Sequence, residues 1–194
     1  MKKTLILLSA LLALPSLSYA GLNPSKLAVG SALGYSIPLS DFRTNYKGSV
    51  ALGVNGEYEV LDILAAGMEI GYNFSYGMKD SAKTESNLTD GTSKIWQFTP
   101  YLKAQQTFEL YGKKAKAYGL FGAGIYSFKT ENTNASATTT DSQSKFGWNA
   151  GLGLMVEVAP KWSAGMDVRY HNISTDYYHT QYFAPMVRMN YHFE

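Results

Sequence analysis

The chain has 194 residues and a formal net charge of +2; 45% of its residues are hydrophobic and 14% are aromatic. This length is typical of one domain, and the absence of cysteine excludes disulfides, thiolate metal sites and a lipid-modified N-terminal cysteine. No stretch after residue 20 approaches the roughly 20 apolar residues that a membrane-spanning helix needs, which argues against a helical membrane protein.

The first 20 residues, MKKTLILLSALLALPSLSYA, predict a secretory signal peptide. Two lysines precede an apolar run over residues 5–14, which is too short for a membrane anchor, and Ser18-Tyr19-Ala20 forms a small-x-Ala cleavage site. The expected organisation is therefore a cleaved signal peptide over residues 1–20 and a single domain over residues 21–194.

Cleavage before Gly21 would remove two of the 17 basic side chains, leaving 17 − 2 = 15 against 15 acidic ones. The mature chain is then formally neutral. Together with the absence of a basic aromatic patch, this neutrality gives no indication of a nucleic-acid partner.

The mature chain repeatedly alternates apolar and polar residues, a pattern typical of β-strands because successive side chains point to opposite faces. Eight segments of roughly 10 to 14 residues show it, and none shows a helical period. They are centred on residues 27–37, 50–60, 68–76, 96–108, 117–128, 146–156, 162–170 and 186–193.

The connections between these segments alternate in length. Long polar stretches at residues 38–48, 78–94, 129–145 and 174–181 alternate with tight turns near residues 61–63, 112–114 and 159–161. This asymmetry is typical of transmembrane β-barrels, which have long external loops and short periplasmic turns.

The distribution of charge indicates which solvent each face meets. If the aromatic-rich face points outward, the other face carries too much charge for the dry core of a soluble sandwich. Its polar members are Glu57, Glu59, Glu69, Lys103, Glu157, Asp167, Arg169, His171, Arg188, Asn190 and His192. The sequence therefore predicts an all-β fold, an eight-stranded antiparallel up-and-down transmembrane β-barrel, with a soluble lipocalin-like barrel as the structural alternative.

Counting residues up from the periplasmic turns places five charged residues at one level of the lumen: Glu69, Lys103, Asp167, Arg169 and Arg188. We expect a lumenal ion-pair network there, with Glu69 paired to Lys103 and Asp167 to Arg188. His171 and His192 are expected as secondary members. An eight-stranded barrel has an interior barely wide enough for its own side chains, so this network would plug the bore.

The opposite face predicts a lipid-facing band with aromatic ends. Its expected members are Trp96, Phe98, Trp148, Trp162, Tyr191 and Phe193. Pro100 and Pro185 both fall within strands. Because proline has no N–H to donate, we expect a broken ladder or a bulge at each, towards the external end of its strand.

These features together resemble the small outer-membrane β-barrel proteins of Gram-negative bacteria, the OmpX-like, OmpW-like and OmpA transmembrane-domain class. The resemblance covers the whole mature chain and includes GAGIYSF, GWNAGLGLMVEVAPKWSAGMDVRY and the C-terminal aromatic strand. It implies a location in the cell outer membrane, contact with the lipid bilayer and lipopolysaccharide, and recognition of the C-terminal strand by the outer-membrane assembly machinery. Tyr191 and Phe193 stand in the aromatic positions of that strand, and Glu194 follows them.

Three functions stay open on this basis. The first is a non-enzymatic surface protein, a plugged barrel whose loops serve envelope structure, adhesion or binding to an unspecified partner, although the loops also read as mobile segments with no partner. The second is passage of small hydrophobic molecules through a narrow lumen or a lateral gap, for which glycines at 119, 122, 124, 151 and 153 could leave a void.

The third is an outer-leaflet enzyme. Arg169-Tyr170-His171-Asn172-Ile173-Ser174 resembles the lipid A deacylase pattern, but Ile173 stands where that pattern has its serine. We therefore predict no catalytic residue. No cofactor or metal site is predicted either, since no His, Asp and Glu cluster has metal-ligand spacing.

Overall fold

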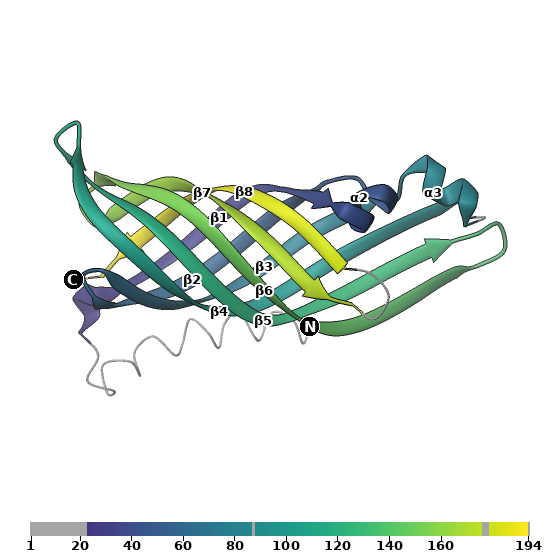
Figure 1. Ribbon diagram of the computed structural model, residues 1–194, viewed down its shortest axis with the longest axis horizontal. Helices are drawn as coiled ribbons and strands as arrows, with labels where there is room; N and C mark the ends of the chain where they lie inside the picture. The colour runs from purple at the N-terminus through teal and green to yellow at the C-terminus, as the bar shows by residue number, and fades with distance from the viewer. Residues whose placement is uncertain (1–22, 87, 176–178, 194) are drawn as a thin grey trace.

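The computed structural model describes residues 23–86, 88–175 and 179–193, so the predicted signal peptide lies outside the described residues. In the described part, eight antiparallel strands close into one barrel in the order β1 to β8, and β8 pairs back to β1 (Figure 1). The predicted eight-stranded antiparallel up-and-down barrel is confirmed. No helix of the described residues has both the length and the apolar character that crossing a membrane as a helix requires.

The elements follow one another along the chain with short connections. They are η2 (Pro24–Lys26), β1 (Leu27–Leu39), α2 (Ser40–Asn45), β2 (Ser49–Leu61), β3 (Leu64–Gly77), α3 (Asp80–Glu85), β4 (Asp90–Leu110), β5 (Lys113–Thr133), β6 (Thr138–Ala159), β7 (Trp162–Ser174) and β8 (His179–His192).

Three strands are much longer than the sequence pattern suggested. β4, β5 and β6 have 21, 21 and 22 residues, and the polar stretch 129–145, expected as a loop, is mostly a β-hairpin. Its threonines favour strands because their branched side chains suit the pleated surface. The stretches 38–48 and 78–94 contain the six-residue helices α2 and α3, which the strand pattern did not predict.

The strand registers define how strongly the barrel is sheared. A path that follows paired residues around the barrel starts on β1 and returns to β1 ten residues further along, since 37 − 27 = 10. It runs through Leu27, Tyr58, Ala66, Leu102, Phe121, Ala150, Tyr170, Phe183 and Ile37. Eight strands with this stagger give a tilted, narrow barrel whose interior is just wide enough for side chains.

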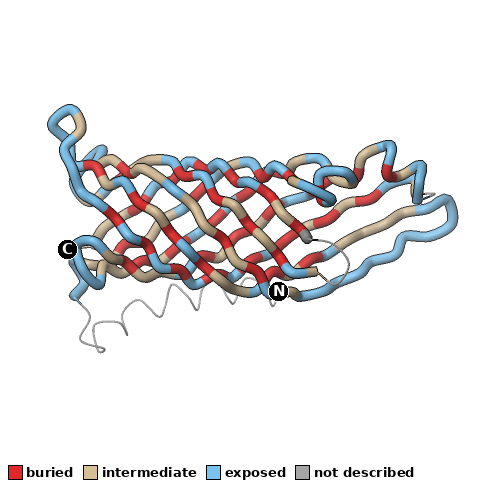
Figure 2. Tube along the Cα trace, viewed as in Figure 1, coloured by how far each residue is buried: buried red, intermediate tan, exposed pale blue. Residues whose placement is uncertain are grey.

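The two faces of the wall differ as the alternation predicts. Exposed and buried residues alternate along the strands (Figure 2), and large apolar side chains such as Leu33, Leu102 and Leu152 point outward. Charged and amide side chains point inward and are buried. The barrel is thus apolar outside and polar at the middle of its interior, as a lipid environment requires.

One β-bulge changes which aromatic residues reach the lumen. The pairing of β3 with β4 shifts register between Asn73 and Tyr76, and Phe74 and Ser75 are both exposed. Tyr76, which the alternation placed on the outer face, is instead completely buried inside. An inserted residue reverses the facing of every side chain beyond it.

Each strand proline interrupts one ladder. At Pro100, the pairing of β4 with β5 stops at Phe98 and resumes at Tyr101 in the same register, while Pro100 still pairs with Met68 of β3. At Pro185, the pairing of β8 with β1 is interrupted between Phe183 and Met186. The expected broken ladder is present at both positions. Both prolines lie near the middle of their strands, so their expected placement towards the external ends is wrong.

A glycine lies against each of these interruptions. A Cβ on Gly34 would lie 2.2 Å from the Pro185 carbonyl oxygen, and a Cβ on Gly124 would lie 2.0 Å from the Phe98 carbonyl oxygen. These two glycines let the neighbouring backbone approach where the ladder lapses.

We expect Gly34→Ala to reduce the free energy of unfolding by about 1–3 kcal/mol, because the added methyl group must displace backbone atoms. Gly56→Ala is the matched control, since a Cβ there meets nothing within 4 Å. Equilibrium unfolding in lipid vesicles, followed by tryptophan fluorescence, measures both. Equal stability of the two variants would contradict the close approach.

Candidate functional site

The centre of the lumen holds a closed ring of four charges. Arg188 Nε lies 2.6 Å from Asp167 Oδ2 and Arg188 Nη2 lies 2.8 Å from Glu69 Oε2. Arg169 Nη1 lies 3.1 Å from Glu69 Oε1 and Arg169 Nε lies 3.0 Å from Asp167 Oδ2. Each carboxylate therefore contacts both guanidinium groups. All four side chains are at most 4% exposed.

The fold brings this ring together from three strands. Glu69 comes from β3, Asp167 and Arg169 come from β7 two residues apart and hence on one face, and Arg188 comes from β8. Neutral groups add hydrogen bonds to both carboxylates: Tyr118 donates to Asp167, and Gln97 donates to Glu69. The expected pair of Asp167 and Arg188 is thus in contact.

Lys103 has a different partner from the one expected. It pairs with Glu57 of β2, which also accepts a hydrogen bond from Tyr101 at 3.1 Å, instead of with Glu69. Across the β3–β4 ladder Lys103 stands opposite Ala65, four residues closer to the periplasmic turn than Glu69. This second pair therefore forms a lower level of the lumen.

The expected pairing of Lys103 with Glu69 was wrong because residues were counted upward from turns that lie at different levels. Gln105 N donates to the Ile63 carbonyl at 2.9 Å, so the β2–β3 turn is level with residue 105, and β4 continues to Leu110. The β4–β5 hairpin therefore projects past the other turns (Figure 1, upper left). Counting from its tip placed Lys103 too high.

The two histidines lie outside the charge ring, contrary to expectation. His171 stacks on Tyr182 with ring centroids 4.4 Å apart, and its Nδ1 lies 3.0 Å from the Tyr126 hydroxyl. His192 lies at the periplasmic end, where its Nε2 is 2.9 Å from Ser163 Oγ. Their different heights on the tilted strands separate them from the ring.

A tier of aromatic residues fills the lumen on the external side of the ring, and sequence reasoning missed it. Tyr76, Tyr126 and Tyr182 are completely or almost completely buried, together with Ile95 and Ile173. Phe42 of α2 packs edge-on against Tyr76 with centroids 4.8 Å apart. The inward parity of Tyr126 and Tyr182 was a usable signal, whereas that of Tyr76 depends on the bulge.

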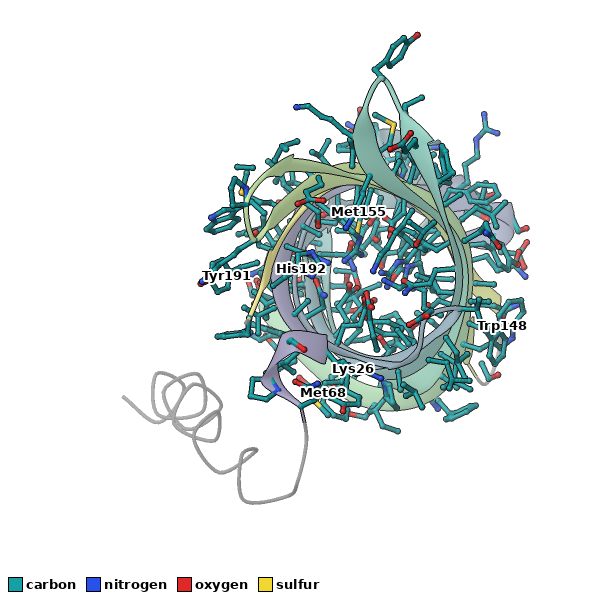
Figure 3. All side chains as sticks on the ribbon, turned by 90° about the vertical axis from the view of Figure 1, so that its left-hand side faces the viewer. Lys26, Met68, Trp148, Met155, Tyr191 and His192 are labelled. Carbon is teal, nitrogen blue, oxygen red and sulfur yellow. The ribbon has the colours of Figure 1, made fainter. Side chains whose placement is uncertain are left out.

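The interior is filled to a large extent. Below the ring, a cavity of about 10 Å³ lies among residues that include Asn55, Lys103 and Tyr118. That volume is about the room needed for one water molecule. Figure 3, a view along the barrel from the side of the short turns, shows His192 and Met155 pointing into the ring of strands and polar side chains crossing its centre.

The six aromatic residues expected on the outer face lie there. Trp96, Phe98 and Trp162 are between 41% and 48% exposed. Trp148 packs between Phe121 and Tyr170, at 6.0 and 5.4 Å. Tyr191 contacts both Trp162 and Phe193, and Figure 3 shows Trp148 and Tyr191 on the outside.

The geometry around His171 does not support the alternative of a catalytic serine–histidine site. Ile173, two residues after His171 and on the same face, is buried, and Ser174 is exposed on the other face. Among the described residues, no group of three or more His, Cys, Asp or Glu side chains could hold a metal ion.

Of the five strand glycines for which a void was expected, two line a pocket, and that pocket lies on the outer wall. Gly119 and Gly151 line a groove that faces outward, together with Leu102, Phe121 and Leu152. The side chains of Tyr118 and Leu120 are buried on the inner face behind it.

The architecture matches a known family. A profile described as outer membrane protein beta-barrel domain covers residues 5–193. The chain belongs to this family. It is accordingly a protein of the cell outer membrane, and its outer face lies in the lipid bilayer. No curated protein matches the sequence.

Solved structures of this barrel type share the fold at low sequence identity. Neisserial surface protein A is 12% identical, with a TM-score of 0.58 over 87% of this chain and 98% of that chain. Ail, the attachment invasion locus protein of Yersinia pestis, in complex with the heparin analogue sucrose octasulfate, is 20% identical, with a TM-score of 0.54 over 87% and 99%. OprG from Pseudomonas aeruginosa is 15% identical, with a TM-score of 0.53 over 89% and 98%.

We expect Glu69→Gln to lower the free energy of unfolding by about 3–5 kcal/mol if the ring is dry, and by less where water reaches it, because two buried guanidinium groups lose a shared partner. Glu157→Gln, at the exposed end of β6, is the control. Adding Arg188→Met to Glu69→Gln restores the balance of charge, so the double variant should lose less than the sum of the single losses. Denaturant unfolding in vesicles gives these values, and a neutral Glu69→Gln would contradict the network.

Proposed function

We propose that this outer-membrane barrel is a non-enzymatic, closed structure that acts through its external surface, in adhesion or binding. The lumen supports this reading, because the charge ring and the aromatic tier both cross it. A ring in which every charge has two partners is a plug that satisfies its own charges, and polar solutes would have to break it to pass.

The observation that carries the proposal is a sheet that extends beyond the barrel rim. The ladder of β6 with β7 ends where Gly147 pairs with Ile173, but β6 remains paired with β5 up to Thr138 and Thr133. β5 is in turn covered by β4 as far as Asp90. Strands β4, β5 and β6 therefore project together on the external side (Figure 1).

One edge of this sheet has no neighbouring strand among the described residues. Residues 138–144 of β6 pair with β5 on one side only, and all seven are exposed. An exposed strand edge presents N–H and C=O groups that can pair with an extended polypeptide. A protein partner that adds a strand to this edge fits the geometry better than a small solute does.

An ion pair on the external side stabilises the projecting sheet that carries this edge. Lys83 of α3 contacts Asp90 at 3.2 Å, which ties the helix to the start of β4. This hydrogen bond raises the pKa of Lys83 and lowers the pKa of Asp90. The tie is therefore present at neutral pH and weakens as the pH falls through the depressed pKa of Asp90.

The name of one structural relative agrees with this class of function. Ail is described as an attachment invasion locus protein and was solved with a polyanionic heparin analogue. In the present chain, Lys94 and Lys129 share the carboxylate of Glu131 at the base of the projecting sheet. Over residues 90–94 and 129–145, three lysines are matched by the three carboxylates of Asp90, Glu131 and Asp141, so the projecting sheet carries no formal net charge. This balance of charge favours a polypeptide partner over a polyanion.

The proposal also covers the export of the chain, its assembly into the membrane and the lipids around the barrel. Residues 1–20 serve as the export signal, and the C-terminal strand with Tyr191 and Phe193 serves as the element that the assembly machinery recognises. Lipopolysaccharide surrounds the external rim. The six outer aromatic residues listed above border the lipid-facing band.

We expect that a phage-displayed peptide library, panned on the folded barrel in nanodiscs, will yield strand-forming peptides. Their binding should be lost in a Thr140→Lys/Ser142→Lys variant, because lysines on an open edge oppose strand addition. Ser81→Lys/Ser86→Lys adds the same charge in and just after α3 and should leave binding unchanged. Failure to enrich any strand-forming peptide, or equal binding to both variants, would contradict the proposal.

A further inference from the structure

The outer wall of the barrel carries an apolar groove of about 700 Å³ that the proposed surface function does not use. It crosses the strands from β3 to β8. Its lining includes Leu102, Gly119, Phe121, Ala150, Leu152 and Tyr170. Since this wall faces the bilayer, the groove opens into hydrocarbon and not into water.

The strand registers explain why the wall is hollow here. Phe121 stands beside Ala150, and Leu152 stands beside Gly119, so each large side chain has a small neighbour across the strand pair. A Cβ on Gly119 would meet only Leu152 Cδ2 at 3.4 Å and the Gly151 carbonyl oxygen at 3.9 Å. The floor of the groove is therefore formed by Gly119 and Ala150, between walls of leucine and aromatic side chains.

The two ends of the groove differ. At the external end, Tyr170 packs against Trp148 and Phe183, at 5.4 and 5.5 Å, and this aromatic cluster borders the groove. At the other end it reaches Leu64, the first residue of β3, next to a periplasmic turn. An elongated apolar ligand would thus enter from the periplasmic side.

The projecting β4–β5 hairpin supplies positive charge below this entrance. Lys113 and Lys114, both exposed, begin β5. Lys113 shares the outward face of Gly119 because six residues separate them, whereas Lys114 lies on the other face and stands opposite Glu109 across the hairpin. Six residues of strand span roughly 20 Å along the tilted direction. Lys113 therefore lies where lipid headgroups meet the periplasm, beneath a groove that fits a hydrocarbon chain.

We propose that this groove is a lipid site that holds one acyl chain of an anionic phospholipid from the periplasmic leaflet, with its headgroup against Lys113. The occupant follows from three features: the apolar lining, the position of the groove within the lipid-facing wall, and the cationic hairpin below its open end. This inference does not depend on the proposed binding role of the external sheet.

Trp148 provides the reporter for a test, because it packs against Phe121 and Tyr170, which both line the groove. The chain has three tryptophans, so Trp96→Phe with Trp162→Phe leaves Trp148 alone. This protein is folded into phosphatidylcholine vesicles that contain a small fraction of lipid with brominated acyl chains, either phosphatidylglycerol or phosphatidylcholine. We expect stronger quenching by the brominated phosphatidylglycerol at equal mole fraction.

Two variants should remove that preference by different routes. Gly119→Leu fills the floor of the groove, and Lys113→Gln removes the charge that selects the headgroup while leaving quenching by phosphatidylcholine unchanged. Gly56→Leu, on the outer face of β2 with open space around it, is the matched control and should keep the preference. Ala150→Leu replaces Gly119→Leu if the latter does not fold.

Equal quenching by the two brominated lipids, or a preference that survives both Gly119→Leu and Ala150→Leu, would overturn the proposal. Displacement of the brominated phospholipid by lipopolysaccharide would assign the groove to a lipid A chain. A dimer that dissociates on Gly119→Leu would assign it to a second copy of this chain. Either result would also overturn the proposal.

Discussion

Burial of four charges in the middle of the barrel is the constraint on which the rest of the structure depends. Glu69, Asp167, Arg169 and Arg188 are enclosed by a wall that is itself surrounded by hydrocarbon, so an uncompensated charge would be costly. Each carboxylate meets both guanidinium groups, which requires β3, β7 and β8 to stand in one register around the bore. A slip of one residue on any of these strands would turn its charge towards lipid. The ring therefore fixes register as well as filling space.

The closed wall and the filled interior explain where function can lie. A closed barrel leaves no strand edge in the bilayer, where an unpaired backbone group would be costly. Among the described residues, strand edges lie beyond the barrel rim at β6 on the external side and at the β4–β5 hairpin on the periplasmic side. β4 and β5 form the periplasmic projection, and together with β6 they form the external one, which offers an unpaired edge to a partner. The uptake alternative includes a lumenal route and a lateral gap. The lumenal route would have to be apolar, and the charge ring crosses it.

Period-two alternation was sufficient to derive the fold and the facing of most residues. Arg188, Asp167 and Glu69 could be assigned to the lumen because each stands between outward apolar neighbours. Their joint level followed approximately from counting along strands. Alternation carries no information on insertions, so the bulge that turns Tyr76 inward was not predictable. It also does not fix how far each hairpin extends, which is why Lys103 received the wrong partner. The polar stretch 129–145 read as a loop because its composition is hydrophilic, whereas its threonines pair across a regular hairpin.

Planar-bilayer recording of the purified barrel tests the closed lumen most directly. If the lumen is closed, the unmodified protein gives no discrete channel openings. Arg169→Ala/Arg188→Ala is also silent, because the aromatic tier still crosses the bore. Adding Tyr126→Ala and Tyr182→Ala to that variant should open a conducting path. Steady openings of the unmodified protein, or currents that change when hydrophobic solutes are added, would contradict the account and support the uptake function.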